Sequence, residues 1–290
     1  MKIGFLGFGE AAFELSTGLK EEGLTSIKAF DVMANDDKFG PQIKSRAQSV
    51  GIQLQDSLSE LLPDIDVLFV AVPASKALEV SATVCSQLNG SSFLYVDVSA
   101  SSPNVKQEIE KGLSDVDIPF VDVAMLGPLP VFKHKVPISA SGNGTEELIK
   151  KMEPYHMNIT SVGNKAGDAS AVKLIRSVFM KGIVGLYLET LQASETFNVS
   201  SEVLSSLEDT MDSHSFMDTL NRLITGTAVH AERRAFELNG SVEMLQEAGL
   251  NANLTSAAKD KLLELAEISA KYQGEDKPLT WKEVISRYDL

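Results

Sequence analysis

The first 31 residues constrain the fold of this chain more than any other segment. An apolar run over 2–6 breaks into a turn that contains Gly7 and Gly9, a helical pattern follows over 10–22, and a second apolar run ends at Asp31. This order of strand, tight turn, helix, strand and acid is typical of a βαβ unit that binds a dinucleotide. A GxGxxA motif alone is weak evidence, and an empty tight turn is the alternative. Here the motif directly follows a strand, and the acid lies 22 positions after Gly9 (31 − 9).

In such a unit each residue type has a physical role. Gly7 makes the turn, Gly9 lets the backbone approach a pyrophosphate at the positive end of the helix, and Ala12 allows close helix–strand packing. Asp31 is expected to bind the ribose hydroxyls, and no Arg or Lys in 32–37 would neutralise a 2′-phosphate, so NAD is favoured over NADP. The loop residues predicted to contact the cofactor are Gly7, Phe8, Gly9, Glu10 and Ala11.

Composition limits the classes of partner. The 290 residues are 43% hydrophobic and 23% charged, which is ordinary for a globular protein of two domains. A net charge of −14 argues against nucleic acid and anionic membranes, yet still allows an anionic small-molecule substrate in a locally positive pocket. The single cysteine, Cys85, fits a reducing cytoplasm, and the N-terminal residues lack the pattern of a signal peptide. No cluster of His, Cys or Asp has metal-ligand spacing, so we expect no metal.

The first half of the chain alternates strand and helix patterns, which predicts a doubly wound, mostly parallel α/β sheet of the Rossmann type. After Gly167 no segment reads as a strand. We therefore predict a dinucleotide-binding domain over 1–163 and an all-helical domain over 164–290 for substrate binding and dimerisation. Strands are expected at 2–6, 27–30, 67–71, 93–97, 120–124, 137–140 and 158–162.

The second half is expected to begin with one helix from Asp168 to about Phe197, with an apolar face that includes Val172, Ile175, Val178 and Phe179. Helical patterns follow at 201–211, 214–222, 228–239, 242–248 and 255–272. Glycines can end helices in a left-handed conformation, and Gly240, Gly249 and Gly274 are placed to do so.

Three loops follow strands of the predicted sheet. Ligands bind at the carboxyl edge of open α/β sheets, where Val72 and Pro73 follow one strand and Ser99 follows the next. The serines over 99–102 have two interpretations: caps for the helix that begins near Pro103, or hydroxyl contacts to substrate or nicotinamide. Gly127, after the fifth strand, offers close backbone approach to a ligand.

Lys173 lies about two turns into the long helix, and Ser177 lies one turn further on the same face. A lysine next to an apolar face is costly unless it points into a polar cavity or extends its ammonium group to solvent. Taken alone, the position favours the second, surface interpretation.

The order of these motifs resembles the β-hydroxyacid dehydrogenase family, which includes 3-hydroxyisobutyrate and 6-phosphogluconate dehydrogenases. The motifs are GxGxxA, a strand-end Val-Pro, DxSxxxP, DxAxxG and GxxxGxxxxxK, and they extend over essentially the whole chain. The segments 172–182 and 230–234 look like a subgroup of phosphogluconate dehydrogenase-like oxidoreductases with their own C-terminal domain.

The resemblance implies that Lys173 is the catalytic general acid/base, that Ser99, Gly127 and Ser177 line the substrate cleft between the domains, and that the helical domains pair as a homodimer. Two residues depart from the family pattern. Ser177 stands where Asn is usual, and Leu126-Gly127-Pro128 replaces Ser-Gly-Gly. Both changes remove polar contacts, so we expect a substrate other than the small branched hydroxyacid of the best-known relatives.

His230, Arg233 and Arg234 fall on one predicted helix. They are candidates to bind a substrate carboxylate or phosphate, and surface salt bridges to Glu232 and Glu237 are an equal alternative. His134, between Lys133 and Lys135, is expected in a solvated turn.

Three functional hypotheses follow. The first is an NAD(P)-dependent dehydrogenase that acts on a 3-hydroxyacid or a sugar-acid derivative. The second is an imine reductase, against which the retention of Lys173 counts. The third class comprises proteins without turnover, either an NAD(H)-binding regulator or a dimeric scaffold.

Overall fold

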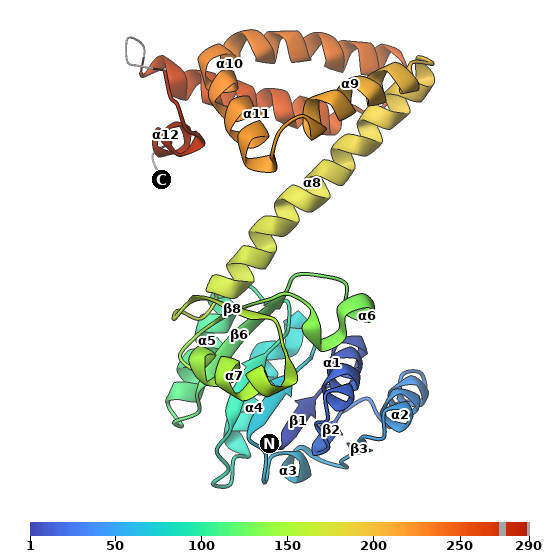
Figure 1. Cartoon of the computed structure of the whole chain (residues 1–290), viewed down its shortest axis with the longest axis vertical. Coiled ribbons are helices and arrows are strands. Elements are labelled where there is room, and N and C mark those ends of the chain that lie inside the picture. Colours follow the sequence, from blue (N-terminus) through green and yellow to red (C-terminus); the bar gives the residue numbers. More distant parts are fainter. Residues whose placement is uncertain (273–276, 289–290) are drawn as a thin grey trace. The chain divides into compact units, whose positions relative to one another are not determined.

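A computed structural model describes residues 1–272 and 277–288 of the chain. The chain divides into two compact units, unit 1 over Met1–Ser177 and unit 2 over Val178–Leu290 (Figure 1). Each unit has its own hydrophobic clusters, so each is described by itself.

Unit 1 contains an eight-stranded sheet in the order β3-β2-β1-β4-β5-β6-β7-β8. All neighbouring strands are parallel except β6 and β7, which are antiparallel. The predicted α/β Rossmann-type class is confirmed, and the order 3-2-1-4-5-6 is that of dinucleotide-binding folds. The strands are β1 (Ile3–Leu6), β2 (Ile27–Phe30), β3 (Gln53–Leu54), β4 (Val67–Val70), β5 (Leu94–Asp97), β6 (Phe120–Met125), β7 (Ile138–Ser141) and β8 (Ile159–Gly163).

Strand residues alternate between two hydrophobic clusters, one on each face of this sheet. Phe5 and Phe69 belong to the first cluster, with residues of α1, α2 and α7. Leu68 and Tyr95 belong to the second, with residues of α3, α4 and α5. Both faces are therefore covered, as a parallel sheet requires. The helices are α1 (Glu10–Glu21), α2 (Gly40–Ser49), α3 (Leu58–Leu61), α4 (Ala77–Ser86), α5 (Pro103–Ser114), α6 (Leu129–Phe132) and α7 (Thr145–Met152), with short 3₁₀ turns at Ala74–Lys76, Lys133–Lys135 and Glu153–Tyr155.

His134 contradicts the expectation of a solvated turn. Its side chain is only 3% exposed and packs against α1, where a Cβ atom on Gly18 would lie 1.9 Å from the His134 Nδ1. Burial lowers the pKa of this imidazole, and the Glu22 carboxylate, 3.7 Å from Nε2, opposes that shift. The flanking Lys133 and Lys135 pair with Glu21 and Glu22. Because charged residues surround His134 in the sequence, the pattern did not predict that its ring is buried.

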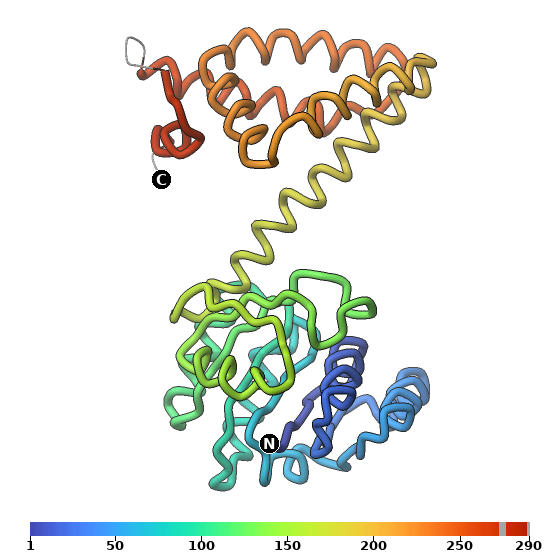
Figure 2. The backbone as a smooth tube through the Cα atoms, viewed as in Figure 1, coloured from blue at the N-terminus to red at the C-terminus, as the bar shows by residue number. Residues whose placement is uncertain are grey.

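The long helix α8 (Asp168–Thr196) is confirmed as one continuous element, which Figure 2 traces as an unbroken coil. Its residues up to Ser177 belong to unit 1 and the rest to unit 2. The expected apolar face is present in the sequence but is not covered by the chain itself: Ile175 is 70% exposed and Val178 is 77% exposed. Lys173 is half-buried.

The described residues of unit 2 form helices joined by short loops, with no strand among them. The three patterns predicted over 214–248 form a single helix, α10, that bends at His230, whose φ of −130° and ψ of 24° are not helical. Gly240 lies inside this helix, so its predicted role as a cap is wrong, whereas Gly249 follows the helix with a φ of +72° as expected. Gly274 lies outside the described residues. The remaining helices are α9 (Ser200–Asp212), α10 (Phe216–Glu247), α11 (Asn253–Ala270) and α12 (Trp281–Ser286).

Candidate functional site

The glycine turn after β1 is shaped by close contact with the segment after β4. Gly7 has a φ of +85°, and a Cβ atom there would lie 2.4 Å from the carbonyl oxygen of Ala71. Only glycine tolerates both the backbone conformation and this approach. At Gly9, by contrast, no other atom lies within 4 Å of the place that a Cβ would take. The turn therefore has no room for a side chain at Gly7 but has open space at Gly9, at the start of α1.

Asp31 holds this turn from the end of β2. Its Oδ2 accepts a 2.7 Å hydrogen bond from the backbone N–H of Phe8, and its Oδ1 accepts one of 2.8 Å from the N–H of Met33. A carboxylate has about four acceptor sites, so both oxygens retain capacity for ribose hydroxyls. Asp31 is therefore a structural clamp for the loop as well as a candidate ribose ligand.

The remaining predicted cofactor contacts differ in what they offer. The Phe8 ring is fully buried in the core and its N–H is taken by Asp31, so this residue fixes the loop. Glu10 and Ala11 begin α1, where the first N–H groups have no partner within the helix. The open space at Gly9 and these N–H groups fit a pyrophosphate, and the residues present therefore fit a dinucleotide.

Val72 and Pro73 lie after β4, next to β1, at the point where the strand order reverses. Gly7 contacts this segment directly, since its Cβ position lies 3.2 Å from Cγ1 of Val72. Ligands of open α/β sheets bind at this switch point. The structure thus brings the glycine turn, Asp31 and the Val72–Pro73 segment to one edge of the sheet.

The serines after β5 share two roles. Ser102 is the N-cap of α5, with Pro103 in the first turn, as the capping interpretation expected. The hydroxyls of Ser99 and Ser101 hydrogen bond to each other at 2.7 Å, and the Ser101 hydroxyl also reaches the Ala74 carbonyl at 3.2 Å. Ser99 is buried, so a ligand that hydrogen bonds to the Ser99 hydroxyl must share that hydroxyl with Ser101.

Beneath Ser99 lies a fully buried lysine that the sequence reasoning missed. The Lys106 Nζ atom lies 3.2 Å from a carboxylate oxygen of Asp97 and 3.2 Å from one of Asp122, and it donates to the Ser99 carbonyl at 2.9 Å. All three charged side chains are inaccessible to solvent. A signal existed: Lys106 occupies the same helical stripe as the buried Ile109 and Leu113.

The same network holds the start of α8. The Asp122 carboxylate accepts 2.8 Å and 2.7 Å bonds from the backbone N–H and the hydroxyl of Ser170, and the Ser141 hydroxyl accepts from the N–H of Ala169 at 3.0 Å. Lys173 lies one turn beyond Ser170, and Ser177 one turn beyond Lys173. The loop of Ser99 and the helix that carries Lys173 are therefore fixed by one buried network, in which Lys106 pairs with both Asp97 and Asp122.

Gly127 lies between β6 and α6, and a methyl group there would meet Val136 at 3.3 Å.

In unit 2, the side chains of Arg233 and Arg234 have different partners. The Arg233 side chain pairs with Glu237 at 3.2 Å, which was one of the alternatives, while Arg234 donates to the Thr227 hydroxyl at 2.6 Å. The roles of Gly127, Arg233 and Arg234 in substrate binding stay predictions.

Another feature that the sequence reasoning missed is Lys44 of α2, which donates to the Asn35 side chain at 2.9 Å and so brings a cation to the loop after Asp31. Within residues 1–272 and 277–288, no group of three His, Cys, Asp or Glu side chains is placed to hold a metal ion. None of the helices in that same part of the chain has the length and apolar character needed to cross a membrane.

Two families match separate parts of the chain. Residues 2–101 match the family of F420-dependent NADP oxidoreductases, and residues 195–265 match a domain of unknown function, DUF1932. An uncharacterised 28.5 kDa protein from Methanothermus fervidus is 29% identical over 240 residues, which cover 82% of this chain and 88% of that protein.

Solved structures show the same architecture along the whole chain. A conserved protein of unknown function, itself structurally similar to 3-hydroxyacid dehydrogenases, is 27% identical, with a TM-score of 0.62 and coverage of 95% of this chain and all of that one (100%). An imine reductase from Myxococcus stipitatus, solved with NAD⁺, is 16% identical, with a TM-score of 0.74 and coverage of 98% and 99%. At this identity the second likeness supports the fold alone.

The fold, the glycine turn and the matches together define the class, a nucleotide-dependent oxidoreductase with the architecture of 3-hydroxyacid dehydrogenases. Within this class the chain joins a segment that matches F420-dependent NADP oxidoreductases to one that matches DUF1932, and both matches are consistent with the β-hydroxyacid dehydrogenase family that its sequence motifs resemble.

Proposed function

We propose that the protein is an NAD-dependent dehydrogenase that acts on a 3-hydroxyacid or a sugar-acid derivative, with Lys173 as general acid/base. The observation that carries this proposal is the glycine turn: closed at Gly7, open at Gly9, and clamped by Asp31. A second observation supports the role of Lys173, which is half-buried one turn from a helix start that buried Asp122 holds in place.

A bound nicotinamide would accept or donate the hydride. The chain's own residues bind, orient and move a proton. The N–H groups at the start of α1 bind the pyrophosphate, Asp31 binds the ribose, and Lys173 exchanges a proton with the substrate oxygen. Ser99, Gly127 and Ser177 line the substrate site.

The first test is NADH formation from NAD by the purified full chain, with a panel of 3-hydroxyacids and aldonic acids. Lys173→Ala is expected to lower turnover by roughly 10²- to 10⁴-fold, the usual contribution of a positioned acid/base. Lys165→Ala, an exposed lysine just before α8, is the matched control and is expected to retain activity. Equal turnover in both variants would remove Lys173 from the mechanism.

The preference for NAD rests on the Asp31 carboxylate, which would face the 2′-phosphate of NADP with like charge. We expect NADH to bind at least about tenfold more tightly than NADPH, a difference of roughly 1.4 kcal/mol. Lys44 is the residue that opposes this preference, so Lys44→Gln is expected to widen the gap. Tighter binding of NADPH to the unmodified chain would contradict the assignment.

Two other functions predict different outcomes from the same variants. An imine reductase would oxidise NADH with cyclic imines, and Lys173→Ala would leave that activity intact. An NAD(H)-binding regulator would give no turnover with any substrate, while Gly9→Val abolished cofactor binding. The carboxylic acid panel and an imine panel, run together, separate the three.

We further propose that the protein is a homodimer. The exposed apolar residues of α8, Ile175 and Val178 above all, form a surface of the kind that a second copy buries. The paired substitutions Ile175→Asp and Val178→Asp are expected to convert a dimer to a monomer in light scattering. Arg176→Asp, exposed on the same helix, is the control. A monomeric unmodified chain at micromolar concentration would overturn this proposal.

A further inference from the structure

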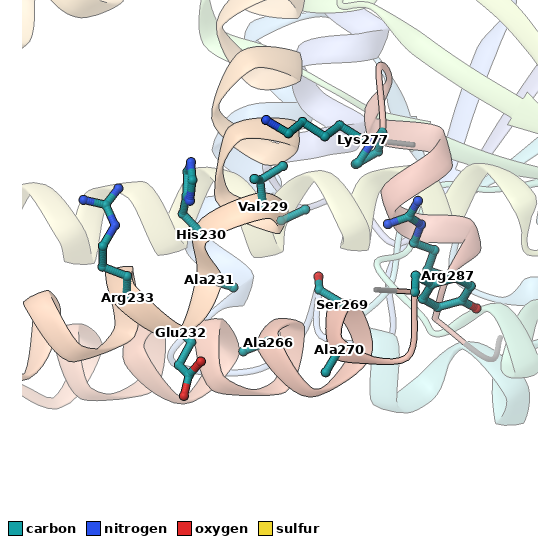
Figure 3. A pocket seen from close by; sticks show the side chains of 13 residues that line it. Val229, His230, Ala231, Glu232, Arg233, Ala266, Ser269, Ala270, Lys277 and Arg287 are labelled. Atoms are coloured by element: carbon teal, nitrogen blue, oxygen red, sulfur yellow. The ribbon is translucent and has the colours of Figure 1, made fainter. Parts of the chain in front are cut away.

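A cavity of about 420 Å³ opens in unit 2 where α10 bends at His230 (Figure 3). Pockets of ~300–1,000 Å³ are the usual size for small organic ligands. The described residues that line this cavity belong to unit 2 and come from α10, from α11 and Tyr272 just after it, from the segment before α12, and from Arg287 just after α12.

Small apolar residues form part of the wall of this cavity. Ala228 and Ala231 are buried on either side of the bend, and Ala266 and Ala270 face them from α11. Ala228 and Ala231 pack on Leu265 and Val284, so they rest on a hydrophobic cluster. A ligand with an apolar body therefore has a complementary surface here.

Cationic side chains form another part of the wall. Arg233, Lys277 and Arg287 line the cavity with one acid, Glu232, which gives a fixed charge of +2 (3 − 1) in a chain of net charge −14. Figure 3 shows the Glu232 carboxylate and the ends of His230 and Arg233 on opposite sides of α10. The three cations come from three different segments of unit 2, and the Arg233 guanidinium also pairs with Glu237 at 3.2 Å.

Neighbouring contacts hold these segments in place. The Asn221 side chain of α10 donates to the Leu279 carbonyl at 3.1 Å and accepts from the Trp281 N–H at 2.7 Å, which fixes the segment that begins with Lys277. The Arg287 guanidinium lies over the Tyr272 ring at 4.8 Å. The cavity is thus lined by groups from a braced arrangement of helices.

We propose that this cavity binds a small carboxylate with an apolar body, with the carboxylate at Arg233 and Lys277 and the apolar part against the alanines. Guanidinium groups match the planar geometry of a carboxylate. The inference goes beyond the proposed dehydrogenase reaction: it gives Arg233 a ligand within unit 2, and Lys277, which has no part in that reaction, separates the two in the test below.

The test is isothermal titration of the full chain with 4-methylpentanoate, its uncharged amide, and inorganic phosphate. We expect 4-methylpentanoate to bind, the amide to bind at least about tenfold more weakly, and phosphate to bind more weakly than the carboxylate. Binding of the amide with equal affinity, tighter binding of phosphate, or no heat from the carboxylate at millimolar concentration would each overturn the proposal.

Variants then locate the binding site. Arg233→Gln and Lys277→Gln remove exposed charges and are each expected to weaken carboxylate binding at least about fivefold, whereas Lys282→Gln, whose ammonium lies over Trp281, is the control. NADH affinity is measured in all three and is expected to stay unchanged. A chain that binds the carboxylate but never turns over a hydroxyacid would refute the proposed reaction alone, and indifference of binding to both substitutions would refute this site alone.

Discussion

Unit 1 buries its side chains on two faces of a sheet, whereas unit 2 leaves much of its apolar surface uncovered. The two clusters of unit 1 include many fully buried large side chains, and even a lysine, Lys106, is completely enclosed. The clusters of unit 2 are small, one centred on Leu265 and one on Leu245, and no residue of α9 is buried. Unit 1 can complete its core alone. Unit 2 exposes apolar side chains that a second copy of the chain would cover, and this exposure is the physical basis for the proposed dimer.

The largest effect is expected when the enclosed charges of unit 1 are broken. Lys106→Met leaves Asp97 and Asp122 buried without their cation, and removal of one partner from a buried pair costs about 3–5 kcal/mol. Hydrogen exchange of peptides that cover β5 and β6 should report this loss, while the fluorescence of Trp281, the single tryptophan, reports unit 2. Lys111→Met, exposed on the same helix, is the control. A loss below about 1 kcal/mol would show that the aspartates find other partners.

Close packing in unit 1 provides the next test. Gly18→Ala places a methyl group 1.9 Å from the His134 ring, and overpacking of this kind costs about 1–3 kcal/mol. Gly112→Ala in α5 has open space and should be neutral or stabilise by up to about 1 kcal/mol. Hydrogen exchange of peptides that cover α1 measures the first variant, and exchange of peptides that cover α5 measures the second. If the steric account is right, His134→Ala should recover part of the loss in the double variant; no recovery would contradict it.

Protein concentration should affect the stability of unit 2 alone if a second copy of the chain completes its core. The denaturation midpoint read from Trp281 fluorescence is then expected to rise with protein concentration, by up to about 1.4 kcal/mol of apparent stability for each tenfold increase. The opening of β5 and β6 in unit 1 should not change. A midpoint that is independent of concentration over two decades would mean that unit 2 is stable as a single copy.

The smallest expected effect is the dependence of the free energy of unfolding on pH. The pKa of His134 in the folded chain lies below its ordinary value of 6.5, so the unfolded chain binds a proton that the folded chain does not between these two values. Stability should therefore fall as pH drops through 6.5, by at most about 1.4 kcal/mol per pH unit, and the fall should end below the folded pKa. Urea denaturation of the unmodified chain and of His134→Asn at pH 7.5 and 5.5 isolates this contribution. The lowered pKa of Glu22 acts only below 4.5, outside this window.

Sequence patterns predicted the strands of unit 1 well because buried parallel strands are short, continuous apolar runs bounded by turns. They missed β3, which is two residues long, and α12, whose six residues carry too little periodicity. Three predicted helices merged into α10 because Gly240 and the segment over 223–227, which contains Gly226, resemble helix ends. The glycine turn and Asp31 could be read directly, since their chemistry depends on local order. The ion partners of Lys106 and the packing of His134 could not be read, because they come from distant strands and helices, although the burial of Lys106 follows the apolar stripe of its own helix.

The hydrogen bond from the Phe8 N–H to Asp31 limits how this protein could change its cofactor during evolution. In a loop where the acid served only the ribose, one substitution at that position could exchange one nicotinamide dinucleotide for the other. Here the same substitution would also release the backbone that shapes the glycine turn. A change of cofactor would therefore pass through a variant with a loosened turn, unless a second acceptor for the Phe8 N–H arose first.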